Sequence, residues 1–256
     1  MKIANRLRSV AGLAALAALV APATFDQMFA ADPIKIGFSM ALTGAIAGNG
    51  RAALLATQMW AEDQNAKGGL LGRPVELIYY DDQSNPSLVP AIYTKLFDID
   101  KVDLVISGYG TNIIGPAMPV VMKHNKVFMS LAGLRVNEQF HYDKYFQIQP
   151  LGPDAHLTFA QGFFDVAMTM DPRPKTVAIS VADSEFPLTA AIGAREWAKK
   201  YGLDISYDRN FPPNMVDFAS IVRAIQASKP DIVYMVGFPP NTVSCAACAK
   251  PGSSQG

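Results

Sequence analysis

The regular alternation of two kinds of segment constrains this chain more than any other feature of its sequence. Over residues 34–131, short β-branched runs alternate with longer runs whose apolar residues recur at helical spacing. The short runs predict strands at Ile34–Met40, Val75–Tyr80, Leu104–Ser107 and Val127–Leu131. The longer runs predict helices at Arg51–Ala66, Pro86–Ile99 and Asn112–His124, the second of them capped by Asn85. This order predicts a parallel sheet with helices on both faces.

The alternation pauses at Ala132–Lys144, which we interpret as a mixed polar loop. It resumes with a strand at Tyr145–Gln149, and Pro150, Gly152 and Pro153 then interrupt the chain. A second series follows, with helices at 153–170, 186–201 and 218–228 and strands at 176–182, 205–207 and 232–236. We therefore expect two α/β lobes that meet near residue 150, over residues 32–149 and 150–241.

Residues 1–31 are typical of a secretory signal. A basic start precedes the apolar run Val10–Val20, and two small-residue sites, Ala21–Ala23 and Phe29–Ala31, are alternative cleavage points. The apolar run has 11 residues, whereas a membrane-spanning helix needs about 20. We therefore expect export to the periplasm, with no other membrane segment.

Charge excludes some classes of partner. Removal of residues 1–31 leaves 19 basic and 21 acidic side chains, so the mature chain is close to neutral. Such a surface does not steer polyanions, and we expect no nucleic-acid partner. Half of the residues are hydrophobic, which excludes a disordered chain.

Motifs for nucleotide or metal chemistry fail on spacing. Gly44–Arg51 lies between a strand and a helix but lacks the Gly-Lys-Ser/Thr ending of a phosphate loop. Gly108, Gly110 and Gly115 also follow a strand, but the second gap is too long for a dinucleotide fingerprint. The loop suits close backbone approach, or the glycines simply serve a tight turn. The three histidines show no metal-ligand spacing: His124, His141 and His156. We therefore expect no cofactor and no metal.

Acid/base and redox chemistry have little support. The candidate carboxylate pairs, Asp81–Asp82 and Asp183 with Glu185, lie at or just beyond strand ends, where solvated carboxylates are common. Cys245 and Cys248 have the spacing of a redox motif, without a thioredoxin-type pattern around them. A local disulfide or a non-native tail is the favoured alternative in an exported chain. We do not expect an enzyme.

Several blocks in order carry a family resemblance. IGFSMALTGAIAGNG, AEDQNAKGGLLGRPVELIYYDDQSNP and KLFDIDKVDLVISGYGT resemble the periplasmic branched-chain amino-acid-binding (Leu/Ile/Val-binding) proteins. The similarity covers residues 34–241. It implies a type I periplasmic binding protein, with two Rossmann-like α/β lobes and parallel sheets, incomplete at its C-terminus. It further implies a small amino acid or carboxylate ligand in the interlobe cleft, delivered to an ABC permease complex.

The resemblance also implies binding residues in the first lobe. The family holds the ligand's carboxylate and amine with the loops after the third and fourth strands, which here contain Gly110, Thr111, Asn112, Ala132, Gly133 and Leu134. The Thr111 hydroxyl and the N–H groups of a helix N-terminus suit an anion, although Thr111 and Asn112 equally suit an ordinary cap. Leu134 replaces a hydroxyl residue. Asn49, after the first strand, is a further candidate or a plain turn residue.

In the second lobe, DSEFP resembles the family's Asp-x-x-Tyr-Gly loop. Asp183 begins it, and Phe186 takes the place of the Tyr, where a ring would pack over a ligand or into the core. Asn241 stands where amino-acid binders carry an acid for the ligand's amine. Because a buried ammonium without a countercharge is costly, an aromatic or short-chain organic acid competes with an amino acid as the ligand.

The tail, residues 242–256, loses apolar periodicity and contains both cysteines of the chain. Our hypothesis is a frameshift near residue 243 that gives an unstructured tail, a truncated protein and impaired binding. Two other functions remain open from the sequence: a periplasmic sensor of the same fold that acts through a receptor or regulator, and a redox enzyme that uses Cys245 and Cys248.

Overall fold

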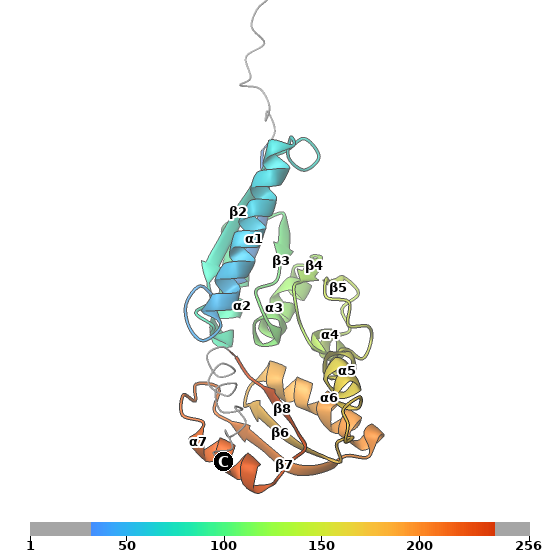
Figure 1. Cartoon of the computed structure of the whole chain (residues 1–256). Helices are drawn as coiled ribbons and strands as arrows, with labels where there is room; N and C mark the ends of the chain where they lie inside the picture. Colours follow the sequence, from blue (N-terminus) through green and yellow to red (C-terminus); the bar gives the residue numbers. More distant parts are fainter. Residues whose placement is uncertain (1–31, 239–256) are drawn as a thin grey trace, which may run out of the picture.

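The computed structural model describes residues 32–238. Its first lobe is built on one sheet of five parallel strands in the order β2-β1-β3-β4-β5 (Figure 1). These strands are β1 (Ile34–Met40), β2 (Val75–Asp81), β3 (Leu104–Ile106), β4 (Phe128–Ser130) and β5 (Tyr145–Gln147). Strand β1 pairs with β2 over its whole length, from Ile34 opposite Val75 to Met40 opposite Asp81. The carboxyl ends of the strands therefore lie along one edge of the sheet.

Helices connect these strands: α1 (Ala47–Ala66), a 3₁₀ turn η2 (Pro86–Leu88), α2 (Val89–Asp98), α3 (Thr111–Lys123) and α4 (Val136–Phe140). The largest core packs α2 and α3 against one face of the sheet, with Tyr93, Met118 and Phe128 fully buried. Helix α1 contacts β1 and β2 on the other face, where Ala61 packs against Ile34 and Ile36. The fold class expected from the sequence, α/β with parallel sheets, is confirmed.

The face of the sheet beside α1 is only partly covered by the described residues. Leu104, Met129 and Phe146, on β3, β4 and β5, project on this side with exposed fractions of 46%, 43% and 53%. Ile148, just beyond β5, is 60% exposed. Parallel sheets normally have both faces covered, so this apolar face, defined by these four residues, is an unusual surface for an α/β protein.

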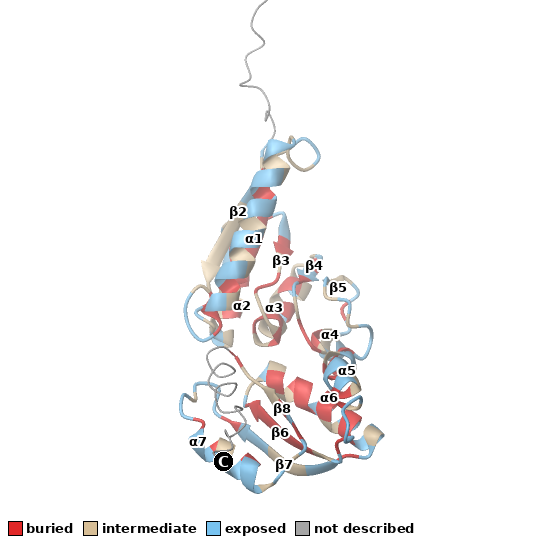
Figure 2. Ribbon diagram, viewed as in Figure 1, coloured by how far each residue is buried: buried red, intermediate tan, exposed pale blue. Residues whose placement is uncertain are grey.

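The second lobe is built on three parallel strands in the order β7-β6-β8. They are β6 (Thr176–Ala182), β7 (Asp204–Phe211) and β8 (Ile232–Val236), and the helices are α5 (Ala155–Ala167), α6 (Glu185–Tyr201) and α7 (Ala219–Ala227). Phe164 of α5 and Trp197 of α6 pack with one face of β6, and Ile221 and Ile225 of α7 pack with the other. Figure 2 shows the buried residues concentrated on β6 and on the faces of the helices that meet it.

Two sequence predictions of local structure were wrong. The segment predicted as the loop Ala132–Lys144 contains α4, because Val136 and Phe140 are one helical turn apart and Val136 is buried where α4 meets α3. The strand predicted at residues 205–207 extends to Phe211. Its polar second half lies at the edge of the sheet, where Arg195 binds Asp208 with two hydrogen bonds of 2.7 and 2.9 Å. The Asn85 cap was predicted correctly, since its side chain accepts a hydrogen bond from the Ser87 N–H.

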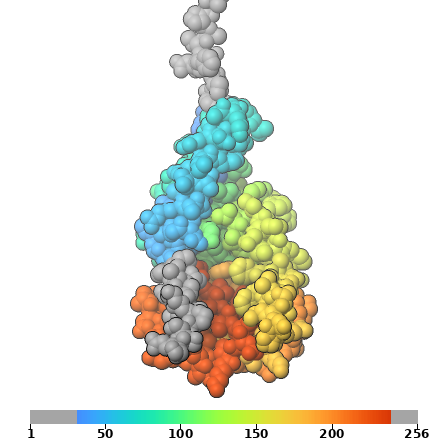
Figure 3. Space-filling model, viewed as in Figure 1, coloured from blue at the N-terminus to red at the C-terminus, as the bar shows by residue number. Residues whose placement is uncertain are grey.

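The two lobes lie one above the other and touch (Figure 3). Helix α3 of the first lobe contacts α6 of the second. Phe238 follows β8, the last strand of the second lobe, but packs into the main core of the first. Phe186, at the start of α6, lies between them, with ring centroids 5.3 Å from Phe159 and 6.1 Å from Phe238.

Candidate functional site

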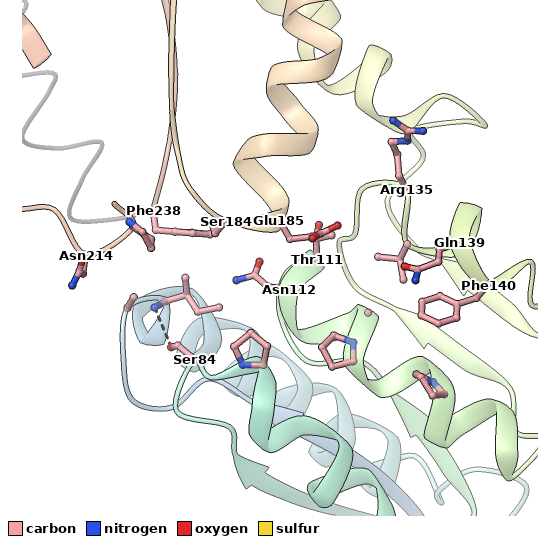
Figure 4. Close-up of a pocket in the computed structure, with 18 residues that line it drawn as sticks. Ser84, Thr111, Asn112, Arg135, Gln139, Phe140, Ser184, Glu185, Asn214 and Phe238 are labelled. Atoms are coloured by element: carbon pink, nitrogen blue, oxygen red, sulfur yellow. Dashed lines mark hydrogen bonds between the residues drawn. The ribbon is translucent and has the colours of Figure 1, made fainter. Parts of the chain in front are cut away.

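A cleft of about 780 Å³ lies where the two lobes face each other (Figure 4). Its walls come from residues that follow the carboxyl ends of β1, β2, β3, β4, β6, β7 and β8. The lining residues are Ala45, Ile46, Ser84, Pro86, Thr111, Asn112, Gly115, Pro116, Pro119, Arg135, Val136, Gln139, Phe140, Ser184, Glu185, Pro213, Asn214 and Phe238. Open α/β sheets bind ligands beyond the carboxyl ends of their strands, and this volume suits a small molecule.

The N-terminus of α3 forms one polar side of the cleft. Gly110 precedes the helix with a positive φ of 94°, which glycine adopts without strain. Thr111 and Asn112 then present the first backbone N–H groups of the helix, which have no partner within it. The Thr111 hydroxyl accepts a hydrogen bond from the Leu134 N–H at 3.0 Å and keeps its own proton free to donate. This end of α3 can therefore bind an anion.

The N-terminus of α6 faces α3 across the cleft. Ser184 precedes α6 in an extended conformation, and its hydroxyl is buried with no hydrogen-bond partner among the described residues. Glu185 is the first residue of the helix and is exposed to the cleft (Figure 4). A carboxylate in this position is stabilised by the helix dipole. The second lobe thus brings a negative charge to a site whose other side attracts anions.

A cation completes the polar groups of the cleft. Arg135 follows β4 and starts α4 with a left-handed φ of 58°. Its Nε donates to Glu138 at 2.6 Å, and both side chains remain about 40% exposed. In Figure 4 the Arg135 guanidinium points away from Thr111 and Asn112. Apolar groups, among them Ile46, Phe140 and Phe238, line the space between these charges.

Of the residues expected from the sequence, Thr111 and Asn112 line the cleft. Gly110 adjoins them as the cap of α3. Gly133 and Leu134 are buried behind Thr111, and Ala132 is half-buried in the same loop. Asn49 lies outside the lining, and its amide donates to the Tyr109 hydroxyl at 2.9 Å on the loop before α3.

In the second lobe, Asp183 is exposed beside the cleft, and Phe186 packs into the interlobe contact behind it. Asn241 lies outside the described residues, as do the predicted signal segment, the tail and Cys245 with Cys248. Arg135 and Glu185 also line the cleft, although neither was among the predicted binding residues. Each lies within two residues of a position that the family pattern had selected, and that closeness was the available signal.

The two aspartates at the carboxyl end of β2, Asp81 and Asp82, hold the loops beside the cleft. Burial alone would raise the pKa of Asp81, but hydrogen bonds from the Thr43 hydroxyl at 2.7 Å and from three backbone N–H groups outweigh it and lower the pKa. Asp82 is fully buried, and burial raises the pKa of its carboxyl. Its Oδ1 accepts from the Ser84 N–H, and Ser84 in turn donates to the Thr43 carbonyl. The expectation of a solvated carboxylate was therefore wrong for Asp82.

Comparison with known proteins defines the family. The model of the family described as periplasmic binding protein matches residues 33–253. The chain belongs to the periplasmic binding protein family. The Leu/Ile/Val-binding protein of Escherichia coli K12 is 23% identical over 233 residues, which cover 91% of this chain and 62% of that protein. The chain thus spans less than two thirds of the length of this relative. The matched relatives are binding proteins and not enzymes, in agreement with the expectation from the sequence.

Solved structures of binding proteins share the fold. The branched-chain amino acid transporter substrate-binding protein of Streptococcus pneumoniae, in complex with isoleucine, has a TM-score of 0.70 at 20% identity, covering 79% of this chain and 56% of that one. An R. palustris solute-binding protein in complex with 4-hydroxybenzoate has a TM-score of 0.69 at 20% identity, covering 80% and 54%. At these identities the likeness shows the type I periplasmic binding protein fold.

Residues 32–238 hold neither a candidate metal site nor a candidate membrane span. No group of three or more His, Cys, Asp or Glu side chains in this part of the chain is placed to hold a metal ion. No helix within the same residues combines the length and apolar character needed to span a membrane.

Proposed function

We propose that this chain is an exported solute-binding component of an ABC importer, and that it holds a small amino acid or organic acid by its carboxylate in the interlobe cleft. The observation that carries the proposal is the convergence of α3 and α6 on one cleft at the carboxyl ends of the strands. The free N–H groups and dipole of α3 favour the carboxylate there, and Arg135, which is ion-paired with Glu138, lines the same cleft.

Glu185 favours an amine on the same ligand. Asn241 provides no countercharge for an ammonium group, which by itself favours an organic acid. Glu185 lines the cleft opposite Thr111 and Asn112 and offers a carboxylate from another position of the second lobe. An α-amino acid places its ammonium beside its carboxylate, which matches an acidic group next to an anion-binding helix end. The apolar lining, including Phe140 and Phe238, suits an apolar side chain in either class of ligand.

The test is calorimetric titration of the 256-residue chain with leucine and with its deaminated analogue 4-methylpentanoate, up to millimolar concentration. We expect weak binding, because the chain spans about three fifths of its relatives, with leucine favoured about tenfold or more through a charge-assisted hydrogen bond. Glu185→Gln should remove that preference while 4-methylpentanoate binds as before. The matched control is Glu62→Gln, at an exposed position of α1. Failure of both ligands, and of benzoate, to bind would overturn the proposal.

The importer role has a separate test. Genes for two permeases and two ATPases beside this one would support transport, whereas a neighbouring sensor kinase would favour the sensor role. A direct measurement is ligand-stimulated ATP hydrolysis by the reconstituted permease complex when this chain is added, compared with the complex alone.

A further inference from the structure

One face of α3 lines the cleft in an unusual way. Asn112, Gly115, Pro116 and Pro119 are spaced by three, one and three residues, which places them along one side of a helix. All four line the cleft. Two prolines inside a 13-residue helix are costly on propensity alone. Both lie on the cleft side, where a ligand would meet the backbone.

The prolines leave backbone acceptors without their helical donors. In an α-helix the N–H of each residue donates to the carbonyl four residues earlier. Because proline has no N–H, Pro116 leaves the Asn112 carbonyl without that hydrogen bond, and Pro119 does the same for the Gly115 carbonyl. The cleft-lining face of α3 therefore carries two backbone carbonyls that need another donor.

Two further observations describe the surroundings of these carbonyls. A Cβ added at Gly115 would meet no atom within 4 Å, so the space above this residue is open. The Asn112 side chain extends into the cleft, and its Oδ1 is buried with no hydrogen-bond partner among the described residues (Figure 4). Three acceptors thus lie along one side of α3: two carbonyls and one amide oxygen. Asn112 and Gly115 are three residues apart, which separates their carbonyls by about 4.5 Å along the helix axis.

We infer that this acceptor row on α3 is a second subsite, which takes a hydroxyl or ammonium group on the part of the ligand remote from its carboxylate. The inference rests on the proposed function, because it assumes a carboxylate held at the N-terminus of α3. A ligand anchored there and lying along the helix would bring such a donor over Gly115. A purely aliphatic side chain would instead cover the carbonyls and leave them unpaired, which is unfavourable. The row therefore selects donor-bearing ligands over aliphatic ones.

The experiment compares ligands of matched shape with and without the donor, by calorimetry on the 256-residue chain. The pairs are 4-hydroxybenzoate against 4-methylbenzoate, tyrosine against phenylalanine, and lysine against norleucine. The first two pairs measure the effect of a hydroxyl donor on affinity, and the third measures the effect of an ammonium donor. We expect the donor-bearing member of at least one pair to bind tenfold or more tightly, because a site built for a hydrogen bond rejects the analogue that lacks it.

A proline variant tests whether α3 is responsible. Pro119→Ala restores a backbone N–H that can satisfy the Gly115 carbonyl, and alanine is a better helix former than proline. We expect the preference for the donor to fall to threefold or less, without a loss of melting temperature. The matched control is Pro90→Ala at the second position of α2, outside the cleft lining, where the Pro86 carbonyl already accepts from the Val89 N–H. It should leave the preference unchanged.

The outcomes separate the two proposals. Binding of both members of every pair with equal affinity would overturn the acceptor row and leave the carboxylate-binding function standing. A donor preference that survives Pro119→Ala unchanged would also overturn the row. No binding of any probe at millimolar concentration would contradict the proposed function and the row together.

Discussion

The Thr111 hydroxyl and the Leu134 backbone N–H are joined by a hydrogen bond of 3.0 Å, and both residues are buried. This bond ties the loop after β4 to the first residue of α3. It fixes the end of the helix that is proposed to bind the ligand's carboxylate, while the Thr111 hydroxyl proton stays available. One side chain therefore links the stability of the first lobe to the geometry of the cleft.

Replacement of Thr111 by Val should test this link. Valine has nearly the same shape but cannot accept the bond, so the Leu134 N–H would be buried without a partner. Such a group costs about 1–3 kcal/mol, and we expect that loss in the free energy of unfolding from urea denaturation. Thr111→Ser should restore most of it. Thr94→Val, at an exposed helix position, is the control and should change stability by less than about 0.5 kcal/mol. Equal effects at Thr111 and Thr94 would contradict the assigned role.

Replacement of Asp82 by asparagine should make the protein more stable. Burial raises the pKa of this carboxyl in the folded state, whereas the unfolded chain has a pKa of about 3.9. Between these two values the folded state holds a proton that the unfolded state has lost, so stability falls as the pH rises. Asp82→Asn removes this loss and keeps an oxygen for the Ser84 N–H. Urea denaturation from pH 4 to pH 8 should show the variant gaining on the wild type as the pH rises.

Asp81 provides a matched control of opposite sign. Its pKa is lowered in the folded state, so its ionised form adds stability above the unfolded pKa and loses that contribution as the pH falls. Asp81→Asn should therefore be less stable than the wild type at pH 7, with the difference shrinking toward pH 3. If the two amide variants changed stability in the same direction at pH 7, the assignment of opposite environments to the two carboxyls would be wrong.

Asp81 and Asp82 show which features of the fold could not be predicted from the sequence. Alternation predicted every strand of both sheets and most helices, because burial in a parallel sheet demands apolar β-branched runs and amphipathic connections. The same pattern places Asp81 and Asp82 equally at the end of β2. Which one points into the core depends on the register of β2 against β1 and on the turn at Ser84, and neither is written in local composition.

The cleft was predicted in part for the same reason. Thr111 and Asn112 follow the apolar strand β3, so their location at its carboxyl end was foreseeable. The positions of Glu185 and Arg135 in the cleft depend on where α6 and α4 begin. The segment that contains α4 was predicted as a loop. The use of Glu185 also requires the two lobes to be brought together, which long-range packing at Phe186 and Phe238 decides.

Phe186 should contribute to the coupling between lobes. Its ring packs on Phe159 of α5 and on Phe238, which belongs to the main core of the first lobe. Because the ring is only partly buried, we expect Phe186→Ala to cost about 2 kcal/mol, less than the 3–5 kcal/mol of a fully buried phenylalanine. The thermal transition should also broaden as the lobes unfold less cooperatively. Phe186→Leu should recover much of the stability, and an unchanged transition in Phe186→Ala would exclude a coupling role.

The apolar face of the first-lobe sheet should govern solubility. Leu104, Met129, Phe146 and Ile148 expose a contiguous apolar surface beside α1, and exposed patches of this kind promote association. Threonine retains β-propensity and removes much of the apolar area, so the double variant Met129→Thr and Phe146→Thr should stay folded. We expect it to remain monomeric at concentrations where the wild type associates, as measured by size-exclusion chromatography with light scattering. Leu71→Asn alters an isolated residue that is 95% exposed, and asparagine tolerates its left-handed φ of 54°, so this variant should associate like the wild type. Equal association of the wild type and the double variant would show that this face is not the surface through which copies meet.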